Sequence, residues 1–305
     1  MRPRLAITLG DPRGIGPEIV AAALRAAPGD VDAIVIGPDG TLVGPDVSVG
    51  SWTPGGSAAE AGRLAGLAIE RAVALARAGE VHGIVTAPID KAALHAGGFD
   101  YPGHTEMLAA LTGHRTAMML TSTGPTAGGH PLRVILATTH IALRDVPEVL
   151  TRDAIEVAAD VTREYLRRWF GIDVPRIALC ALNPHAGDGG RFGTEDDALL
   201  APAARDFGLV GPLPADTVFV RAMRGAFDAV IAPYHDVGMT AIKVAAFGHG
   251  VNVTLGLPFP RTSPDHGTAL DIAGRGIADP SSFRAALELC AALARRVESD
   301  AAVTG

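Results

Sequence analysis

Three histidines occupy equivalent places in the chain, each shortly after a run of β-branched and aliphatic residues. They are His140, His185 and His235, and the runs before them span 134–139, 177–181 and 229–232. Ligand sites of open α/β sheets lie outside the carboxyl ends of the strands, where these side chains would meet. A single loop histidine is more often solvated or hydrogen-bonded locally. The threefold repetition nevertheless favours a divalent metal site that keeps positions open for a substrate.

A second polar segment, Gly103-His104-Thr105-Glu106, opens a predicted helix at Thr105. The amides and the hydroxyl group at such a helix start can hold an anion. An ordinary helix capped by Thr105 accounts for the same residues equally well. The segment by itself leaves both interpretations open.

Lys243, Asn252 and Arg261 follow His235 within one stretch of chain. A lysine and an arginine that converge with an asparagine would hold a phosphate group, although each alone is more often a surface residue or part of an ion pair. Only two of the 26 cationic side chains are lysine, Lys91 and Lys243. An arginine-rich codon usage would explain this bias. The two lysines that remain are still candidates for a site that needs a compact ammonium group.

Glycine is concentrated in the stretch 265–280, which suggests a loop shaped around a ligand or, alternatively, a tight turn into a helix. The usual nucleotide motifs are missing. Gly14-Ile15-Gly16 is followed by Ile19 where a GxGxxG fingerprint has its third glycine, and no GxxxxGK[ST] loop occurs. A dinucleotide bound by this chain would therefore use another route than the Rossmann turn.

The elements that must position these residues alternate between short strands and alanine- and leucine-rich helices. Strands are predicted at 5–9, 33–36, 83–86, 118–121, 133–138, 177–181, 229–232 and 251–255, and helices at 17–26, 57–78, 151–170, 194–207 and 281–297. This alternation predicts an α/β fold with a mostly parallel, doubly wound sheet. The stretch 122–132 indicates a hairpin or an excursion between two strands.

Composition restricts the class of protein. Of 305 residues 48% are hydrophobic, and the net charge is −7 without a long basic run, which argues against nucleic acid as the main partner. Cys180 and Cys290 lack the spacing of a structural zinc site or a disulfide framework. No signal peptide fits the first residues, and no apolar run approaches the about 20 residues that cross a bilayer. We therefore expect a cytoplasmic protein without a membrane partner.

Together these motifs resemble the 4-hydroxythreonine-4-phosphate dehydrogenase family, which is related to the isocitrate and isopropylmalate dehydrogenases. The matching segments are Gly10-Asp11-Pro12, 14–18, 86–91, 103–106, 139–141, 183–187, 211–217, 234–236 and 250–280. The resemblance thus covers nearly the whole chain in family order. It implies the isocitrate/isopropylmalate dehydrogenase-like fold, with two lobes and a cleft. We expect one lobe at 1–103 plus 250–305, with the NAD-binding loop, and a metal and dimerisation lobe at 104–249.

The resemblance also implies roles for individual residues. The metal ligands would be His140, His185 and His235, with one of them contributed across a homodimer interface. Substrate contacts would be His104, Thr105, Lys243, Asn252 and Arg261. The implied catalytic residues are Asp216, Asp236 and Lys243, with the two aspartates near the metal and one of them assisting proton transfer. His266, Gly267 and Asp271 would bind the cofactor. The carboxylate of Asp271 suits a free ribose hydroxyl and repels a 2′-phosphate, so NAD is favoured over NADP.

The implied activity is a metal-dependent, NAD-linked oxidation and decarboxylation of 4-phosphohydroxy-L-threonine to 3-amino-2-oxopropyl phosphate in pyridoxal phosphate biosynthesis. The metal would be zinc, magnesium, cobalt or manganese. Two departures concern the substrate: Val237-Gly238-Met239-Thr240 stands where relatives usually carry Gln-Gly-Leu-Pro, and Arg13 replaces a small residue.

The departures leave alternative activities open. A 4-phospho-D-threonate or 4-phosphoerythronate dehydrogenase is the nearest alternative. Relatives that oxidise aromatic cis-dihydrodiols are disfavoured, because the segments 103–106 and 261–263 that would hold a phosphate group are retained. A phosphate acyltransferase of similar fold, which needs neither metal nor nicotinamide, and a metal-dependent aldolase or hydrolase are the alternatives from other classes.

Overall fold

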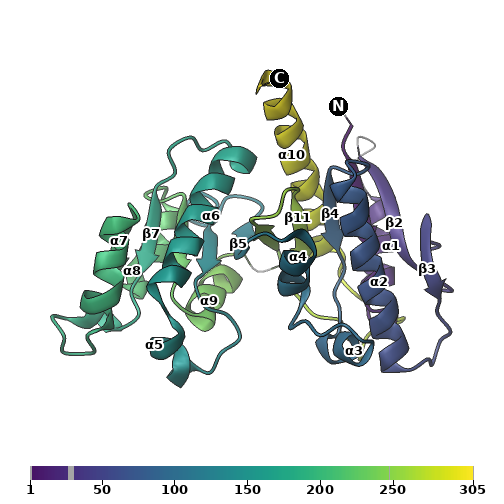
Figure 1. Ribbon diagram of the computed structural model, residues 1–305, viewed down its shortest axis with the longest axis horizontal. Coiled ribbons are helices and arrows are strands. Elements are labelled where there is room, and N and C mark those ends of the chain that lie inside the picture. The colour runs from purple at the N-terminus through teal and green to yellow at the C-terminus, as the bar shows by residue number, and fades with distance from the viewer. Residues whose placement is uncertain (1, 27–30, 247, 305) are drawn as a thin grey trace. The chain divides into compact units, whose positions relative to one another are not determined.

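The computed structural model describes residues 2–26, 31–246 and 248–304. The chain divides into two compact units, Met1–His114 with Val251–Gly305 (unit 1) and Arg115–Gly250 (unit 2). Figure 1 shows the helices and strands of both. Among the described residues, no helix has both the length and the apolar composition that crossing a bilayer requires.

Unit 1 contains a mostly parallel sheet with strand order β3-β2-β1-β4-β11-β10. The strands are β1 Arg4–Thr8, β2 Asp32–Asp39, β3 Val47–Ser51, β4 Gly83–Thr86, β10 Gly250–Leu255 and β11 Arg261–Pro264. Only β10 and β11 pair antiparallel; β11 then runs parallel to β4. This arrangement brings the residues of β11 next to the carboxyl end of β4.

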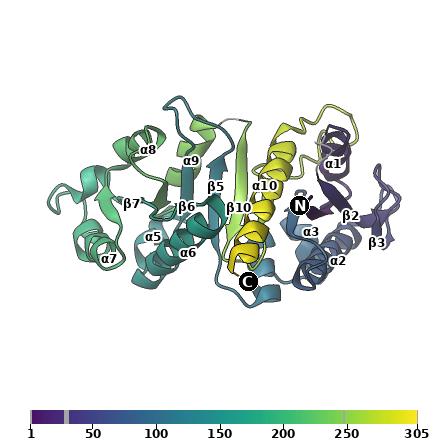
Figure 2. The same ribbon diagram turned by 90° about the horizontal axis from the view of Figure 1, so that it is seen from above.

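In its described part, unit 1 has the helices α1 Gly16–Arg25, α2 Ala58–Arg77, α3 Lys91–Ala96, α4 His104–Thr112 and α10 Ser281–Thr304. Helices α1 and α10 pack together (Figure 2). Helix α2 packs on β1 to β4, and α3 and α4 pack on α2. Helix α2 begins one residue after the start predicted for it, and Ser57 caps it: its hydroxyl accepts a hydrogen bond from the Glu60 amide at 3.1 Å.

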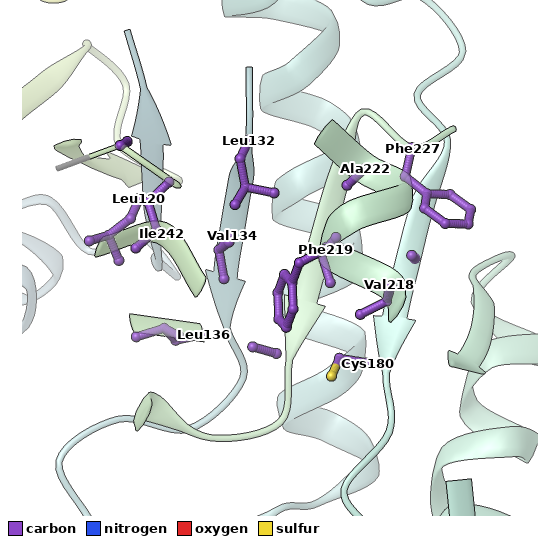
Figure 3. Close-up of a cluster of buried hydrophobic side chains, with 14 residues drawn as sticks. Leu120, Leu132, Val134, Leu136, Cys180, Val218, Phe219, Ala222, Phe227 and Ile242 are labelled. Atoms are coloured by element: carbon purple, nitrogen blue, oxygen red, sulfur yellow. The ribbon is translucent and has the colours of Figure 1, made fainter. Parts of the chain in front are cut away.

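Unit 2 has the strand order β5-β6-β9-β7-β8. Its elements are β5 Ala117–Ser122, β6 Arg133–Leu136, α5 Val146–Val149, α6 Arg152–Phe170, β7 Ile177–Cys180, α7 Ala201–Asp206, β8 Val210–Leu213, α8 Ala215–Met223, β9 Ala229–Ala232 and α9 His235–Ala245. Strands β5 and β6 form the expected antiparallel hairpin, and β6, β9, β7 and β8 run parallel. A buried cluster that includes Leu120, Val134, Phe219 and Ile242 joins the sheet to α8 and α9 (Figure 3).

The α/β fold class is confirmed, and every predicted strand is present within two residues of its expected ends, except that β2 runs three residues longer. Three strands were missed: β3, β8 and β11. Strand β8 contains Gly211-Pro212, and β11 reads Arg-Thr-Ser-Pro, so neither shows an apolar pattern. The helix predicted at 194–207 is present, since the chain is helical from Glu195 to Asp206. Its first part, Asp196–Leu200, is a π-helix that leads into α7, and no side chain caps it.

The contact between α2 and α3 depends on glycine at position 62. A methyl group added to Gly62 would lie 1.8 Å from the carbonyl oxygen of Ala93, a backbone atom that cannot rotate away. We predict that Gly62→Ala lowers the free energy of unfolding by about 1–3 kcal/mol through overpacking. The about 1 kcal/mol that alanine gains in a helix is too small to reverse the sign.

Chemical denaturation measures this difference. Gly44→Ala is the matched control, because an added methyl group there meets no atom within 4 Å. Equal stability of the Gly62 and Gly44 variants would mean that α3 can shift without cost.

Candidate functional site

Two of the three predicted metal ligands lie together in unit 2. His140 follows β6 and His235 begins α9 directly after β9, and these two strands are parallel neighbours. The ring centroids of the two imidazoles are 5.5 Å apart. Nδ1 of His235 lies 2.7 Å from Oδ1 of Asp236. A carboxylate that accepts the Nδ1 proton leaves Nε2 as the nitrogen able to bind a metal.

The third histidine lies apart from this pair. His185 follows β7 in a short turn and lines a cavity of about 280 Å³ together with Asn183, Asp216 and Tyr234. Within the described ranges, no group of three or more His, Cys, Asp or Glu side chains is close enough to hold a metal. The structure therefore associates Asp236 with His235, and Asp216 with His185.

The backbone at these histidines is unusual. His140 has a φ of 42° and His185 a φ of 54°, both in the left-handed region that L-residues rarely adopt. Such conformations persist where the surrounding structure enforces them, and they cluster at functional sites. The turn around His185 is held by Asp196, a fully buried carboxylate that accepts hydrogen bonds from the Leu182 and Asn183 amides at 2.8 and 2.9 Å. Sequence analysis missed Asp196 because nothing distinguishes it from other helix-start aspartates.

A second polar cluster lies in unit 1 around Arg261, whose residue is only 1% exposed. Its guanidinium donates to the hydroxyl oxygens of Thr254, at 3.0 Å, and Thr86. Three buried polar atoms here have no hydrogen-bond partner: Nε of Arg261, Nε2 of His104 and Oδ1 of Asn252. Asn252 and Thr254 lie on the same face of β10, because side chains two apart on a strand point the same way.

Charge in this cluster is positive. Desolvation lowers the pKa of Arg261 to about 10, against the opposing influence of Cys290 and Glu106, so the group stays protonated at neutral pH. The pKa of His104 is held well below its ordinary value by desolvation and by the charges of Arg261 and Lys91. A neutral imidazole thus lies beside a buried cation. The unpartnered Nε–H of Arg261 suits an anion, whereas the unpartnered Oδ1 of Asn252 is an acceptor and suits a ligand hydroxyl or amine.

Helix α4 contributes its first turn to the same place. It begins at His104 with Gly103 as the N-cap residue, and no side chain caps it. The interpretation of Thr105 as the capping residue is therefore wrong, since Thr105 lies inside the first turn. The uncapped amides of a helix start favour an anion. Lys243, which was expected to share this substrate site, belongs to α9 in unit 2.

The glycine-rich stretch 265–280 forms an irregular loop packed on the first glycine segment of the chain. Ile15 donates its amide hydrogen to the Thr268 carbonyl at 2.9 Å, and the Glu18 carboxylate accepts from the amides of Gly274 and Gly276. A cavity of about 600 Å³ lies here, lined by residues that include Arg13, Glu18, Trp52, Gly40 and Gly274. Asp271, His266 and Gly267 belong to this loop but not to the lining of the cavity.

Arg13, which departs from the family pattern, has a defined partner. Its side chain donates to both oxygens of Asp11, at 3.0 and 2.7 Å, and lies 3.4 Å from Asp90. The side chain of Asp11 is 1% exposed, and Arg13 is its cationic partner. The contact ties the first glycine segment to the segment that starts α3.

The chain is similar to known proteins over nearly its whole length. Residues 19–290 match the family model described as pyridoxal phosphate biosynthetic protein PdxA. The chain belongs to this family. A 4-hydroxythreonine-4-phosphate dehydrogenase from Stenotrophomonas maltophilia is 43% identical, covering 97% of this chain and 98% of its own. A D-threonate 4-phosphate dehydrogenase from Pectobacterium atrosepticum is 40% identical, covering 95% and 99%.

Solved structures of the PdxA family confirm the fold. The crystal structure of 4-hydroxythreonine-4-phosphate dehydrogenase from Klebsiella pneumoniae aligns with a TM-score of 0.81 at 38% identity, over 96% of this chain and 99% of the other. An isocitrate dehydrogenase from Methylococcus capsulatus aligns with a TM-score of 0.52 at 18% identity, over 97% and 88%, a likeness of fold alone. The expected relation to the isocitrate dehydrogenase-like fold is thus confirmed.

Removal of the Arg13 side chain is expected to destabilise unit 1. Arg13→Ala leaves the buried Asp11 carboxylate without its cationic partner, and we predict a loss of about 1–3 kcal/mol in the free energy of unfolding. Arg168→Ala is the control, because the Arg168–Glu164 pair is about half exposed on both sides and should contribute less than about 0.5 kcal/mol.

Urea denaturation of both variants, and of Arg13→Ala combined with Asp11→Asn, decides the point. The double variant removes the unpaired charge and should recover part of the loss. If Arg13→Ala is as stable as Arg168→Ala, the Arg13–Asp11 pair does not stabilise the first glycine segment.

Proposed function

We propose that this protein is a metal-dependent, NAD-linked dehydrogenase that oxidises and decarboxylates 4-phosphohydroxy-L-threonine to 3-amino-2-oxopropyl phosphate. The observation that carries the proposal is the pair of imidazoles, His140 and His235, at the ends of adjacent parallel strands. The unpartnered donors around Arg261 suit the phosphate group of such a substrate. The relatives named above, at 40 and 43% identity, carry dehydrogenase names, which favours this chemistry over acyl transfer.

The donor set fits a divalent cation. Imidazole nitrogens bind zinc, cobalt and manganese, and magnesium less readily. His235 has the second hydrogen-bond partner, Asp236, that metal-binding histidines usually have. Two imidazoles do not complete a site of three protein ligands, so we propose that His185 of a second subunit supplies the third, in a homodimer.

The chain's own residues would divide the remaining work. When bound, the cation would polarise the substrate hydroxyl and NAD would accept the hydride. His104, Thr105, Asn252 and Arg261, with Lys243 from unit 2, would hold the substrate. Asp236 already contacts His235, so we assign proton transfer to Asp216, with Lys243 as the second group. The loop with His266, Gly267 and Asp271 would bind NAD, whose ribose hydroxyl suits the exposed Asp271 carboxylate.

A second candidate has support of its own. Val237-Gly238-Met239-Thr240 lies in the first two turns of α9, directly after the proposed ligand His235, and departs from the usual family sequence. A relative at 40% identity is named for D-threonate 4-phosphate. Oxidation of 4-phospho-D-threonate or 4-phosphoerythronate therefore stays the alternative.

Turnover with and without a chelator tests the proposal. We expect NADH formation with one of the phosphorylated substrates, its loss on chelation, and its return when one of the four metals is added back. His140→Ala and His235→Ala should each lose at least 100-fold in kcat/KM with the fold intact by circular dichroism, because each removes a metal ligand. Chelator-resistant turnover, or near-normal activity of both variants, contradicts the metal assignment.

Mixing inactive variants tests the shared site. If His140 and His235 act within one chain and His185 crosses to the other, a mixture of His140→Ala and His185→Ala chains regains one intact site in each heterodimer. Random exchange then restores about a quarter of wild-type activity. A mixture of His140→Ala with His235→Ala should stay inactive, since every site lacks a ligand. Recovery in the second mixture instead of the first overturns this pairing.

A further inference from the structure

Lys91 is one of only two lysines in the chain, and none of the roles described above uses it. It is the first residue of α3, and its side chain is exposed. The chain folds back so that Lys91 reaches the start of α4: a methyl group on Gly103 would lie 3.5 Å from Cε of Lys91. The charge of Lys91 also acts on the buried imidazole of His104.

The carboxylate beside Lys91 in the chain is already engaged elsewhere. Asp90 caps α3 by accepting the amide hydrogen of Ala93 at 2.9 Å, and it lies 3.4 Å from the guanidinium of Arg13. Among the residues that the structure describes, neither Lys91 nor Arg261 forms an ion pair within 4.0 Å. The contact of Asp90 with Arg13 thus holds the start of α3 in place. The carboxylate that lies near Lys91 at Gly103 is that of Glu106, whose Oε2 would be 3.4 Å from the same added methyl group.

The charged groups around Gly103 carry a net positive charge, which favours the binding of an anion. Two cations, Arg261 and Lys91, lie near His104, whose imidazole is neutral, and the carboxylate that opposes them in the first turn of α4 is Glu106. Nε of the fully buried Arg261 lacks a partner, and the first-turn amides of α4 are uncapped. A buried guanidinium donor without an acceptor is costly, so an oxyanion that binds here gains both charge and hydrogen bonds.

We propose that Lys91 is an anion-binding residue of unit 1 that, with Arg261 and the amides of α4, contacts the phosphate group of the substrate. The identity of that phosphate ester depends on the proposed function, whereas the site itself takes inorganic phosphate. Lys91 supplies a positive charge for phosphate binding from within unit 1, so that binding of phosphate there does not depend on Lys243 of unit 2. Its exposure lets the ammonium group meet an incoming ligand before the buried guanidinium does.

Titration calorimetry with inorganic phosphate tests the proposal on the full-length protein. Lys91→Gln should weaken phosphate binding about tenfold or more, as expected for the loss of one charge-assisted hydrogen bond. Lys91→Arg keeps the charge and should lose less. Arg63→Gln is the matched control: it removes one exposed positive charge from α2, the helix that packs on α3, and should bind phosphate as the wild type does. All three variants should unfold at the wild-type temperature without phosphate, because both side chains are exposed.

The outcomes separate this proposal from the proposed function. Wild-type phosphate affinity in Lys91→Gln, or loss of the same size in Arg63→Gln, overturns the role of Lys91. A wild-type protein that turns over a phosphorylated substrate but binds no inorganic phosphate also overturns it, while the dehydrogenase survives. Phosphate binding that depends on Lys91 in a protein that oxidises neither substrate supports Lys91 and overturns the dehydrogenase. With turnover, KM for the phosphorylated substrate should rise in Lys91→Gln by a factor similar to that for phosphate.

Discussion

A guanidinium group buried without a carboxylate is the feature on which unit 1 depends. Arg261 stays in the sheet because two threonine hydroxyls, from β10 and β4, accept hydrogen bonds from its terminal nitrogens. These bonds satisfy only part of its donors, and desolvation lowers its pKa to about 10 without removing the charge. The remaining donor, the neutral imidazole of His104 and the uncapped start of α4 form a place that is more stable when an anion fills it.

The two units stabilise their buried carboxylates in different ways. In unit 1 the buried carboxylate of Asp11 pairs with the guanidinium of Arg13. Arg13 also contacts Asp90, so it joins the first glycine segment to the segment that starts α3. In unit 2 the fully buried Asp196 is satisfied by backbone amides of the turn that carries His185. Both carboxylates thus fix the backbone or side chains of a loop through hydrogen bonds. One of these loops carries His185, which we propose as a metal ligand, and a loop that is already ordered reduces the ordering cost of binding.

Parallel strand pairing explains the imidazole pair. Neighbouring parallel strands end at the same edge of a sheet. The residues that follow β6 and β9 therefore lie close together as a direct result of the strand pairing. The left-handed backbone of His140 then turns its ring towards that of His235. His185 obeys the same topological rule after β7, yet its turn directs it to the cavity with Asp216. Topology brings the histidines to one region of the unit, and local backbone conformation decides which rings approach.

The sequence by itself determined the α/β class, the positions of the apolar strands along the chain and the family. Apolar periodicity is a local feature of the sequence, and the family motifs recur along nearly the whole chain. The sequence also identified the histidines and Arg261 as residues of interest. Only the tertiary structure decided that the ring of His140 lies near that of His235, that α4 starts at His104, and that β11 brings the charge of Arg261 near His104. Strand β11 has no apolar pattern, and its place in the sheet follows from pairing with β10 and β4. The carboxylate partners of Arg13 and the approach of Lys91 to Gly103 were equally hidden. Both are set by distances between loops, which one sequence does not encode in any local pattern.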